Sequence, residues 1–410
     1  MTVHRISGPL AGVVLEEMTG ARGEPRHARL ARIQLSDGSV LDEGLALWFP
    51  GPGSFTGEDV AELHLHGSAA VERALHDALT ARGLVPAGPG AFTLRAFENG
   101  KLDLSQAEGL ADLLRAETEG QRRHALGQLG GRLSDTAERW RDGLVEILAL
   151  LAASIDFSDE DDVPGELDAR IAQRLVSLLA EMDEALEGAV PAARLREGVR
   201  VVLTGPPNVG KSSLLNALAG QNHAIVSDLP GTTRDLIEVR MERGGQLVVL
   251  IDTAGLRESA DVVERMGIER AERAVKEADI RLELRSIEEI RDPAPTDGAI
   301  YVATKADDHG ATMPPGWIPA SVRRRGGLDA LLVELDSKLN SADAGPLVRR
   351  RQVDATREAR QRLVDARAAT EPELVSAQIR AALLSLDTLI GRVGTEDVLG
   401  AIFAEFCIGK

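Results

Sequence analysis

The segment Gly205–Ser212 constrains this chain more than any other, because its sequence GPPNVGKS has the form G-x-x-x-x-G-K-S. It directly follows Arg200–Thr204, a mostly apolar run with the composition of a buried strand. A strand, a glycine-rich loop and a helix in this order form a phosphate-binding loop, whose backbone N–H groups face phosphate oxygens. The segment therefore predicts a parallel α/β domain that binds a nucleoside triphosphate. Lys211 is expected to face the phosphates, and Ser212 can bind Mg²⁺.

Three later segments follow in the order that a GTP-binding domain requires. Gly231–Asp235 offers threonine hydroxyls to a metal ion once the γ-phosphate is present. The apolar run Leu247–Ile251 precedes Asp252–Gly255, whose aspartate can hold Mg²⁺ through water and whose glycine amide can contact the γ-phosphate. The run Ala299–Ala303 precedes Thr304–Asp307, and a carboxylate there accepts both Watson–Crick-edge N–H groups of guanine. Adenine lacks that pair of donors, so the predicted nucleotide is GTP.

Leu256 stands directly after Gly255, where many GTPases carry a glutamine that orients the attacking water. A leucine side chain cannot make that hydrogen bond, so another group must position the water. Glu264 and a monovalent cation held by Asn208 are both candidates, and the sequence leaves the choice open.

Residues 1–101 have the mixed pattern of an α+β domain. Alternating or apolar runs predict strands at Arg29–Leu35, Leu41–Trp48 and Val60–His66, with turn residues between them. A helix is expected over Ser68–Arg82.

The hydrophobic period becomes helical after Leu102. Two stripes with spacings of three and four residues predict long helices: Leu133, Ala137, Trp140, Leu144, Ile147 and Leu151, and then Leu167, Ile171, Leu175, Leu178, Met182 and Leu186. Residues 198–345 alternate short apolar runs with helical ones, and the helical pattern returns after Pro346. We therefore predict an N-terminal α+β domain (1–101), an α-helical bundle domain (102–197 and 346–410) and an inserted α/β P-loop GTPase domain (198–345).

Charge and cysteine content further narrow the classes of protein to which this chain could belong. The net charge is −18, from 47 basic and 65 acidic residues, which disfavours unaided binding to bulk nucleic acid. Cys407 is the single cysteine, so no intrachain disulfide forms. The first residues contain no apolar signal-peptide core, and the longest apolar stretch is too short to cross a membrane. We expect a cytoplasmic protein.

Several longer segments together resemble the tRNA-modification GTPases of the MnmE (TrmE) family. They span nearly the whole chain in the order found in that family. The matching segments are Ser54–Asp59, Arg95–Leu104, Gly231–Asp235, Asp252–Arg257 and Phe406–Lys410.

The resemblance implies a tetrahydrofolate-binding N-terminal domain that forms a homodimer, a helical domain and an inserted GTPase. Such enzymes act with an FAD-dependent partner of the MnmG (GidA) type. Together they add a (carboxymethyl)aminomethyl group to C5 of the wobble uridine of certain tRNAs, with the one-carbon unit taken from 5-formyl- or methylene-tetrahydrofolate.

The resemblance also assigns residues by motif. Glu264 would position the attacking water, and Lys211 would neutralise the β- and γ-phosphate oxygens. Mg²⁺ would be held by Ser212 and Thr233. K⁺ would lie among Asn208, Ser227, Leu229 and Thr232. The folate contacts would be Arg5, Glu62, Lys101 and Lys410. The remaining GTP contacts would come from Val209, Gly210, Ser213, Asp252, Thr253, Ala254, Gly255, Lys305 and Asp307, with Thr304 where the family usually has asparagine.

Of four further features, the first three leave alternatives open. Glu62, His64 and His66 alternate on a predicted strand and could form a pocket wall, a metal site or an ordinary polar face. Arg349–Arg367 is a basic stretch that could contact tRNA or simply face solvent. Cys407 could be reactive or packed near Phe403 and Phe406. In Ala278–Arg285, charged residues alternate with leucines, which predicts a strand with one wet face.

Three functions compete. The first is a GTP-driven tRNA-modification enzyme, and the second is a regulatory GTPase without chemistry of its own. The third is a diverged copy that kept the fold and lost activity. The N-terminal segments and the Cys407–Lys410 end favour the first, because a pure regulatory GTPase needs neither.

Overall fold

The computed structural model describes residues 1–156, 163–221, 237–252, 272–307, 313–339 and 344–393. The chain divides into two compact units. The first comprises Met1–Ala111, Gln128–Val145 and Arg380–Lys410, and the second comprises Asp112–Gly127 and Glu146–Ile379. Within the described residues, none of the helices has the length and apolarity needed to cross a membrane.

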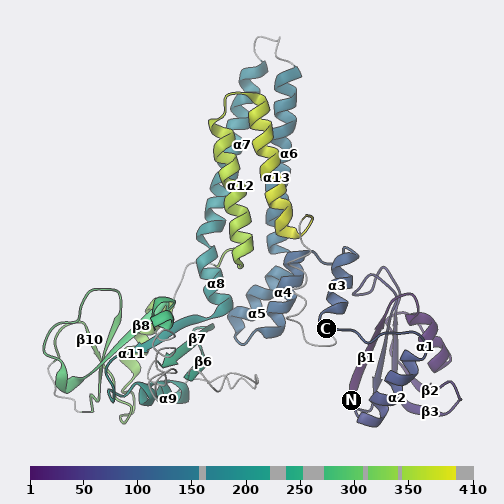
Figure 1. The fold of residues 1–410 in the computed structure, drawn as a ribbon, viewed down its shortest axis with the longest axis horizontal. Helices are drawn as coiled ribbons and strands as arrows, with labels where there is room; N and C mark the ends of the chain where they lie inside the picture. The colour runs from purple at the N-terminus through teal and green to yellow at the C-terminus, as the bar shows by residue number, and fades with distance from the viewer. Residues whose placement is uncertain (157–162, 222–236, 253–271, 308–312, 340–343, 394–410) are drawn as a thin grey trace, which may run out of the picture. The chain divides into compact units, whose positions relative to one another are not determined.

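The first unit begins with a four-stranded antiparallel sheet in the order β1-β4-β3-β2 (Figure 1). Its strands are β1 (Thr2–Ser7), β2 (Arg29–Gln34), β3 (Val40–Phe49) and β4 (Val60–Leu65). One face packs against α1 (Ala11–Thr19) and α2 (Ala69–Thr80) around a buried core that includes Ile6, Leu15, Met18, Leu63 and Leu75. The predicted strands and α2 are confirmed, and Ser68 caps α2 by accepting the Val71 N–H at 3.2 Å.

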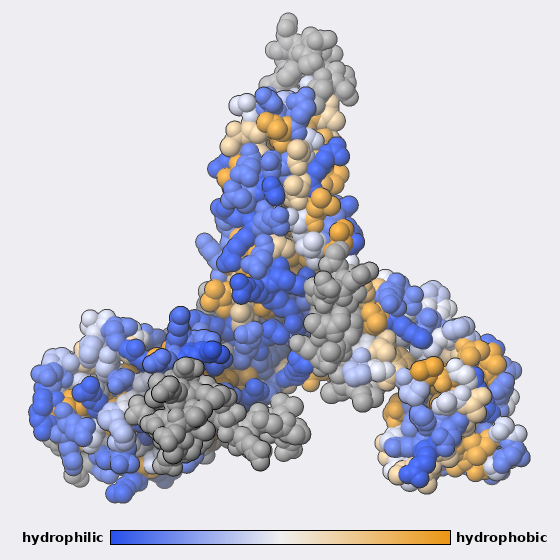
Figure 2. Space-filling view, in the orientation of Figure 1, coloured by the Kyte–Doolittle hydropathy of each residue, from blue (hydrophilic) through white to orange (hydrophobic). Residues whose placement is uncertain are grey.

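The opposite face of this sheet carries polar residues among apolar ones. Alternation along each strand places Arg5 on the same face as Glu62 and His64. Four hydrophobic side chains of these strands are exposed, namely Val3, Leu30, Val40 and Leu45. Figure 2 shows hydrophobic patches on the visible surface of the N-terminal region.

Among the described residues, eight helices of eight to 25 residues lie outside the two sheets and their covering helices. They are α3 (Ala91–Glu98), α4 (Leu104–Arg115), α5 (Glu119–Leu129), α6 (Arg132–Asp156), α7 (Val163–Glu187), α8 (Ala189–Glu197), α12 (Arg350–Ala368) and α13 (Pro372–Ile390). All six stripe residues predicted on α6 are buried, and on α7 the buried members are Ile171, Leu175, Leu178 and Met182. In the second unit α12 packs against α7, where Arg360 forms an ion pair with Asp183. The two predicted stripes therefore do face a helical core.

The second unit contains a six-stranded sheet in the order β10-β9-β8-β5-β7-β6. The strands are β5 (Val199–Thr204), β6 (Ile237–Arg243), β7 (Gln246–Asp252), β8 (Ile280–Ser286), β9 (Ile300–Thr304) and β10 (Trp317–Pro319), and only β6 is antiparallel to its neighbour. One face is covered by α9 (Lys211–Gln221) and α11 (Asp329–Leu339), which bury Leu214, Leu218, Leu331 and Leu335 against it.

The other face of this sheet explains the unusual composition of β8. Leu282 and Leu284 are buried under α9 and α11, whereas Arg281, Glu283 and Arg285 alternate with them on the opposite face and keep part of their surface in solvent. The connection to β9 is described throughout and holds only the short 3-10 helix η2 (Ile287–Glu289). Because no α-helix from this connection covers the face, polar residues suit it, and the prediction of a strand with one wet face is confirmed.

Candidate functional site

The phosphate-binding loop connects β5 to α9, as its sequence predicts. Gly205 has a φ of +135°, and a Cβ there would lie 2.3 Å from the Leu284 carbonyl oxygen, so only glycine fits. Gly210 has a φ of +102° and Asn208 a φ of +60°. The left-handed residues turn the backbone tightly just before α9, whose first N–H groups are available to an anion.

Lys211 lies inside the loop, with only 6% of its surface exposed. Its Nζ donates to the carbonyl oxygens of Gly205 and Pro206, each at 2.9 Å. The ammonium group is therefore held over the loop, where it can transfer its hydrogen bonds to phosphate oxygens.

The next residue joins the loop to β7. Ser212 Oγ donates to Asp252 Oδ2 at 2.6 Å, and the Asp252 side chain is fully buried. A hydroxyl and a carboxylate are hard oxygen donors of the kind that Mg²⁺ prefers, so this pair fits the predicted metal. Ser213, also predicted as a nucleotide contact, is exposed next to it on α9, while Val209 is buried.

The predicted base-binding residues begin at the last residue of β9 and continue into the loop that follows it. Thr304 Oγ1 lies 2.7 Å from the Val209 carbonyl oxygen and 3.1 Å from that of Arg285, and the residue is 5% exposed. Lys305 adopts a left-handed φ of +59°. The structure thus ties the predicted base loop directly to the phosphate-binding loop.

Asp307 has a partner that the sequence prediction did not include among the site residues. Ser321 Oγ donates to Asp307 Oδ1 at 2.6 Å, and Ser321 is 2% exposed. The Ser321 hydroxyl also accepts the backbone N–H groups of Arg323 and Arg324 at 3.3 and 3.2 Å. These bonds hold the Asp307 carboxylate in one orientation, which is what recognition of two N–H groups on a base requires. The signal in the sequence was the segment Ala320–Val322, which loosely matches the last base-contacting loop of the family.

Part of the predicted nucleotide site lies outside the described residues. This applies to Ser227, Leu229, Thr232, Thr233, Thr253, Ala254, Gly255 and Glu264, and also to Cys407 and Lys410 at the other predicted site.

A second cluster lies on the polar face of the N-terminal sheet. Arg5 Nε donates to Glu62 Oε1 at 2.8 Å, because the two residues are register partners on β1 and β4. His64 Nε2 lies 3.3 Å from the other oxygen, Glu62 Oε2, and the Arg5 guanidinium sits over the Phe92 ring at 5.7 Å. Two of the predicted folate contacts are thus brought together. Lys101 instead donates to the Pro52 carbonyl oxygen at 3.0 Å.

The segments Ser54–Asp59 and Arg95–Leu104, which carried the family resemblance, form one hydrogen-bond network beside this cluster. Arg95 donates to Glu58 at 2.9 Å and to the Ser7 carbonyl oxygen at 2.7 Å. Asn99 donates to the Thr56 carbonyl oxygen at 2.7 Å. The network fixes the loop after β3 against α3 and β1.

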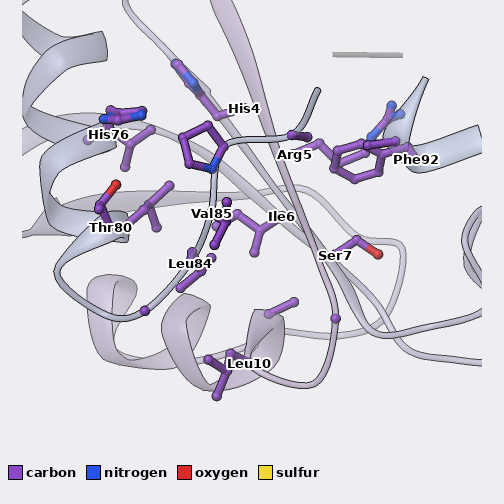
Figure 3. A pocket seen from close by; sticks show the side chains of 18 of the residues that line it. His4, Arg5, Ile6, Ser7, Leu10, His76, Thr80, Leu84, Val85 and Phe92 are labelled. Atoms are coloured by element: carbon purple, nitrogen blue, oxygen red, sulfur yellow. The ribbon is translucent and has the colours of Figure 1, made fainter. Parts of the chain in front are cut away.

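A cavity of about 1120 Å³ runs along β1, α2 and the segment that leads to α3 (Figure 3). Ile6, Leu84 and Val85 give it an apolar wall, and Arg5 and Phe92 belong both to this cavity and to the cluster above. A cavity with an apolar wall and a few polar groups around it is typical of a small-molecule site.

The metal interpretation of the alternating residues on β4 finds no support in the described parts of the chain. His66 Nδ1 lies 2.9 Å from Asp42 Oδ1, away from the Glu62 and His64 pair. No group of three or more His, Cys, Asp or Glu side chains with a metal-binding arrangement occurs among the described residues.

The basic stretch Arg349–Arg367 lies on and just before α12, where several arginines pair within the protein. Arg349 Nη2 donates to Asp112 Oδ1 at 2.8 Å, and both side chains are 14% exposed. Arg360 pairs with Asp183 on α7, whereas Arg350 is 95% exposed. The stretch therefore holds helices together as well as presenting charge, and the visible surface of this helical region is largely hydrophilic (Figure 2).

Comparisons with known proteins cover the entire chain. Residues 1–101 match the model described as GTP-binding protein TrmE N-terminus, and residues 104–407 match the MnmE helical domain. Proteins called tRNA modification GTPase MnmE are 46% identical over 436 residues in Phenylobacterium zucineum (strain HLK1) and 46% over 427 residues in Rhodopseudomonas palustris (strain ATCC BAA-98 / CGA009). Each comparison covers 100% of this chain and 96% of the relative.

Among solved structures, the G domain of the T. maritima FeoB iron transporter is 24% identical. That comparison covers 34% of this chain and 96% of the other, with a TM-score of 0.23, which supports no further conclusion. Both family models match this chain, and the full-length relatives share its phosphate-binding domain. The chain therefore belongs to the MnmE family of tRNA-modification GTPases and is a GTP-hydrolysing enzyme.

Proposed function

We propose that GTP hydrolysis by this chain drives modification of C5 of the wobble uridine in certain tRNAs. An FAD-dependent partner of the MnmG type acts with it, a (carboxymethyl)aminomethyl group is added, and a tetrahydrofolate supplies the one-carbon unit. The observation that carries the proposal is the presence of two separate candidate sites in one chain. The Lys211 and Ser212–Asp252 site suits a nucleotide, and the Arg5–Glu62 pair beside an apolar cavity suits a small molecule.

At the nucleotide site, Lys211 neutralises the β/γ-phosphates and the Asp307 carboxylate pairs with guanine. Ser212 and Thr233 hold Mg²⁺, which when bound offsets the charge that develops on the transferred phosphoryl group. In this proposal Asn208, Ser227, Leu229 and Thr232 surround K⁺, and Glu264 orients the attacking water. Because no glutamine follows Gly255, other groups must position the attacking water, which supports this assignment.

At the N-terminal site, we assign folate to Arg5, Glu62, Lys101 and Lys410. The guanidinium of Arg5 suits a carboxylate, while both Glu62 oxygens can accept N–H groups from a heterocycle. The exposed hydrophobic residues of the N-terminal sheet support the homodimer that the family resemblance implies. Because tRNA is the substrate in this proposal, the enzyme works in the cytoplasm.

Reconstitution tests this function directly. The purified chain is mixed with the FAD-dependent partner, unmodified tRNA, GTP, K⁺, Mg²⁺ and 5-formyl- or methylene-tetrahydrofolate, and the nucleosides are analysed by mass spectrometry. We expect the C5 modification with the natural chain and none with Lys211→Ala, which should fold normally but lose hydrolysis. If the natural chain hydrolyses GTP yet leaves every uridine unmodified, the chemical part of the proposal is wrong.

Folate binding has its own test, because it does not require the partner. Calorimetry with 5-formyltetrahydrofolate should show binding to the natural chain with or without GTP. Arg5→Ala should weaken it by about 1–3 kcal/mol, the cost of losing a charge-assisted hydrogen bond. Arg32, which is 72% exposed on β2 and pairs with the surface residue Glu43, provides the matched control Arg32→Ala. Equal heats for ligand and buffer would count against the folate assignment.

A further inference from the structure

The turn between β6 and β7 caps the first turn of α5. The Gly120 N–H donates to the Gly245 carbonyl oxygen at 3.1 Å. The first N–H groups of a helix have no partner within the helix, so they are satisfied by side chains, water or another part of the protein. Here the partner is the tip of a hairpin that belongs to the GTPase sheet, and Figure 1 shows this hairpin reaching toward α5.

Glycine on both sides makes this close approach possible. A Cβ on Gly120 would lie 2.3 Å from the Gly245 carbonyl oxygen, a distance that real Cβ atoms do not reach. Gly244 and Gly245 have φ values of +58° and +80°, which a two-residue hairpin turn of this kind requires. Because glycine is less favourable than alanine within a helix, the contact is the physical reason for glycine at position 120.

A second contact lies beside the first. Arg240 on β6 forms an ion pair with Glu117, two residues before α5. The segment around Glu117 is itself fixed, because Gln121 Oε1 accepts the N–H groups of Glu117 and Thr118 at 2.9 and 3.1 Å. Gln121 also donates to the Arg196 carbonyl oxygen at 2.9 Å, so the hairpin meets a well-anchored helix start.

The same hairpin ends at the nucleotide site. β7 runs from the turn to Asp252, which is bonded to Ser212 of the phosphate-binding loop. Its seven residues span about 23 Å at roughly 3.3 Å each. β6 begins at Ile237, shortly after the Gly231–Asp235 segment that is predicted to meet the γ-phosphate. Both strands of the hairpin therefore connect a nucleotide-binding segment to the tip that caps α5.

The base of the inserted domain is anchored independently of this tip. Asp112 Oδ1 on α4 accepts Arg196 Nε at 3.0 Å and Arg349 Nη2 at 2.8 Å. Arg196 lies where the chain enters the GTPase sheet, and Arg349 lies where it returns to α12. The chain segments that enter and leave the sheet are both held by the Asp112 carboxylate. A movement within the sheet therefore reaches α5 through the hairpin and not through these segments.

We propose that the Gly120–Gly245 contact couples the nucleotide state to the helical region. A change at Asp252 and Ser212 displaces β7 along its length, and the hairpin tip then makes or releases the cap on α5. The two sites are joined by a continuous strand, and each nucleotide favours one position of the tip. The coupling requires GTP binding only, so it does not depend on the proposed tRNA chemistry.

Hydrogen exchange on the full chain tests this coupling. The chain is loaded with GDP or with a non-hydrolysable GTP analogue, and deuterium uptake is measured in peptides that cover residues 117–127. In the natural chain we expect exchange in the first turn of α5 to differ roughly five- to tenfold between the two nucleotides, as loss of a helix cap implies. Gly120→Ala should abolish the difference, because its methyl group prevents the tip from seating with either nucleotide.

Gly127→Ala is the matched control, because a Cβ on Gly127 in the same helix meets nothing within 4 Å. It should keep the natural difference. GTP hydrolysis by Gly120→Ala shows whether its nucleotide site is intact. If that variant does not fold, Glu117→Gln is used in its place. It should reduce the difference in exchange between the two nucleotides by weakening the ion pair with Arg240. Equal exchange with both nucleotides in the natural chain, or a full difference in folded Gly120→Ala or in Glu117→Gln, would overturn the coupling even if tRNA modification proceeds.

Discussion

Thr304 shows how one side chain can serve the nucleotide site without touching the nucleotide. Its hydroxyl carries a single hydrogen, which is directed at the Val209 or Arg285 carbonyl oxygen in a buried position. The residue therefore braces the base loop against the phosphate-binding loop and has no hydrogen left for guanine. An asparagine amide carries two hydrogens and is longer, so it can brace the loop and reach the base as well.

We accordingly predict that Thr304→Asn binds GDP more tightly than the natural chain. Thr304→Val keeps the shape but leaves a buried carbonyl oxygen unpaired, which should weaken GDP binding by about 1–3 kcal/mol. Thr304→Ser retains the hydroxyl and serves as the control. Calorimetry with GDP measures all three, and an unchanged or weaker affinity in Thr304→Asn would contradict the prediction.

His4 should make stability depend on pH. Burial lowers the pKa of His4 below its usual 6.5, and the nearby Glu72 carboxylate opposes that shift. The unfolded chain then binds a proton more readily than the folded chain, so stability is present above about pH 6.5 and is lost as the pH falls through the folded-state pKa. The free energy of unfolding should fall between about pH 7 and pH 5, and His4→Gln should have a smaller fall. Identical pH profiles for the two chains would exclude this role.

At the scale of elements, the arginines at the start of α12 are of two kinds: some form ion pairs within the protein, and others face solvent. Arg349→Gln leaves the largely buried Asp112 with one fewer cation, and loss of one partner of such a pair costs about 3 kcal/mol. Arg350→Gln, one position away and 95% exposed, should cost less than about 0.5 kcal/mol. Urea unfolding of both variants checks the contrast, which would be refuted by equal losses.

Elements with a strong repeating pattern were predictable from the sequence, and those defined by their partners were not. The stripe on α6 and the alternation on β8 identified both elements, because burial on one side imposes a period on the sequence. β1 was not predicted as a strand, since only Ile6 of its six residues is buried and its hydrophobic alternation is weak. α1 was also missed, because its nine residues are too few to show a clear stripe.

The same distinction applies to the site residues. The phosphate-binding loop was predictable because its backbone geometry demands glycine and lysine at fixed spacing. The bond between Ser321 and Asp307 joins two separate loops, and the bond between Arg349 and Asp112 spans 237 positions. No local spacing encodes such partners, so only the folded arrangement reveals them.

For the molecule as a whole, we predict faster GTP hydrolysis in K⁺ than in Na⁺. The left-handed Asn208 in the phosphate-binding loop and Leu256 in place of a glutamine motivate the prediction. A site made of an amide, hydroxyls and carbonyl oxygens replaces the hydration shell of a cation of one radius only. Hydrolysis is measured in the two chloride salts at matched ionic strength, with Asn208→Ala expected to reduce the preference. Equal rates in the natural chain would refute it.

The ion pair between α7 and α12 has a consequence for how the protein is made. Asp183 and Arg360 are 177 positions apart, so the ribosome completes all six strands of the second unit's sheet before α12 can meet α7. Once that sheet has folded, the search is shorter, because the Gly345 N–H donates to the Gly188 carbonyl oxygen at 3.0 Å and so brings the chain on either side of the sheet together. We therefore expect the sheet to fold during synthesis before α12 packs against α7.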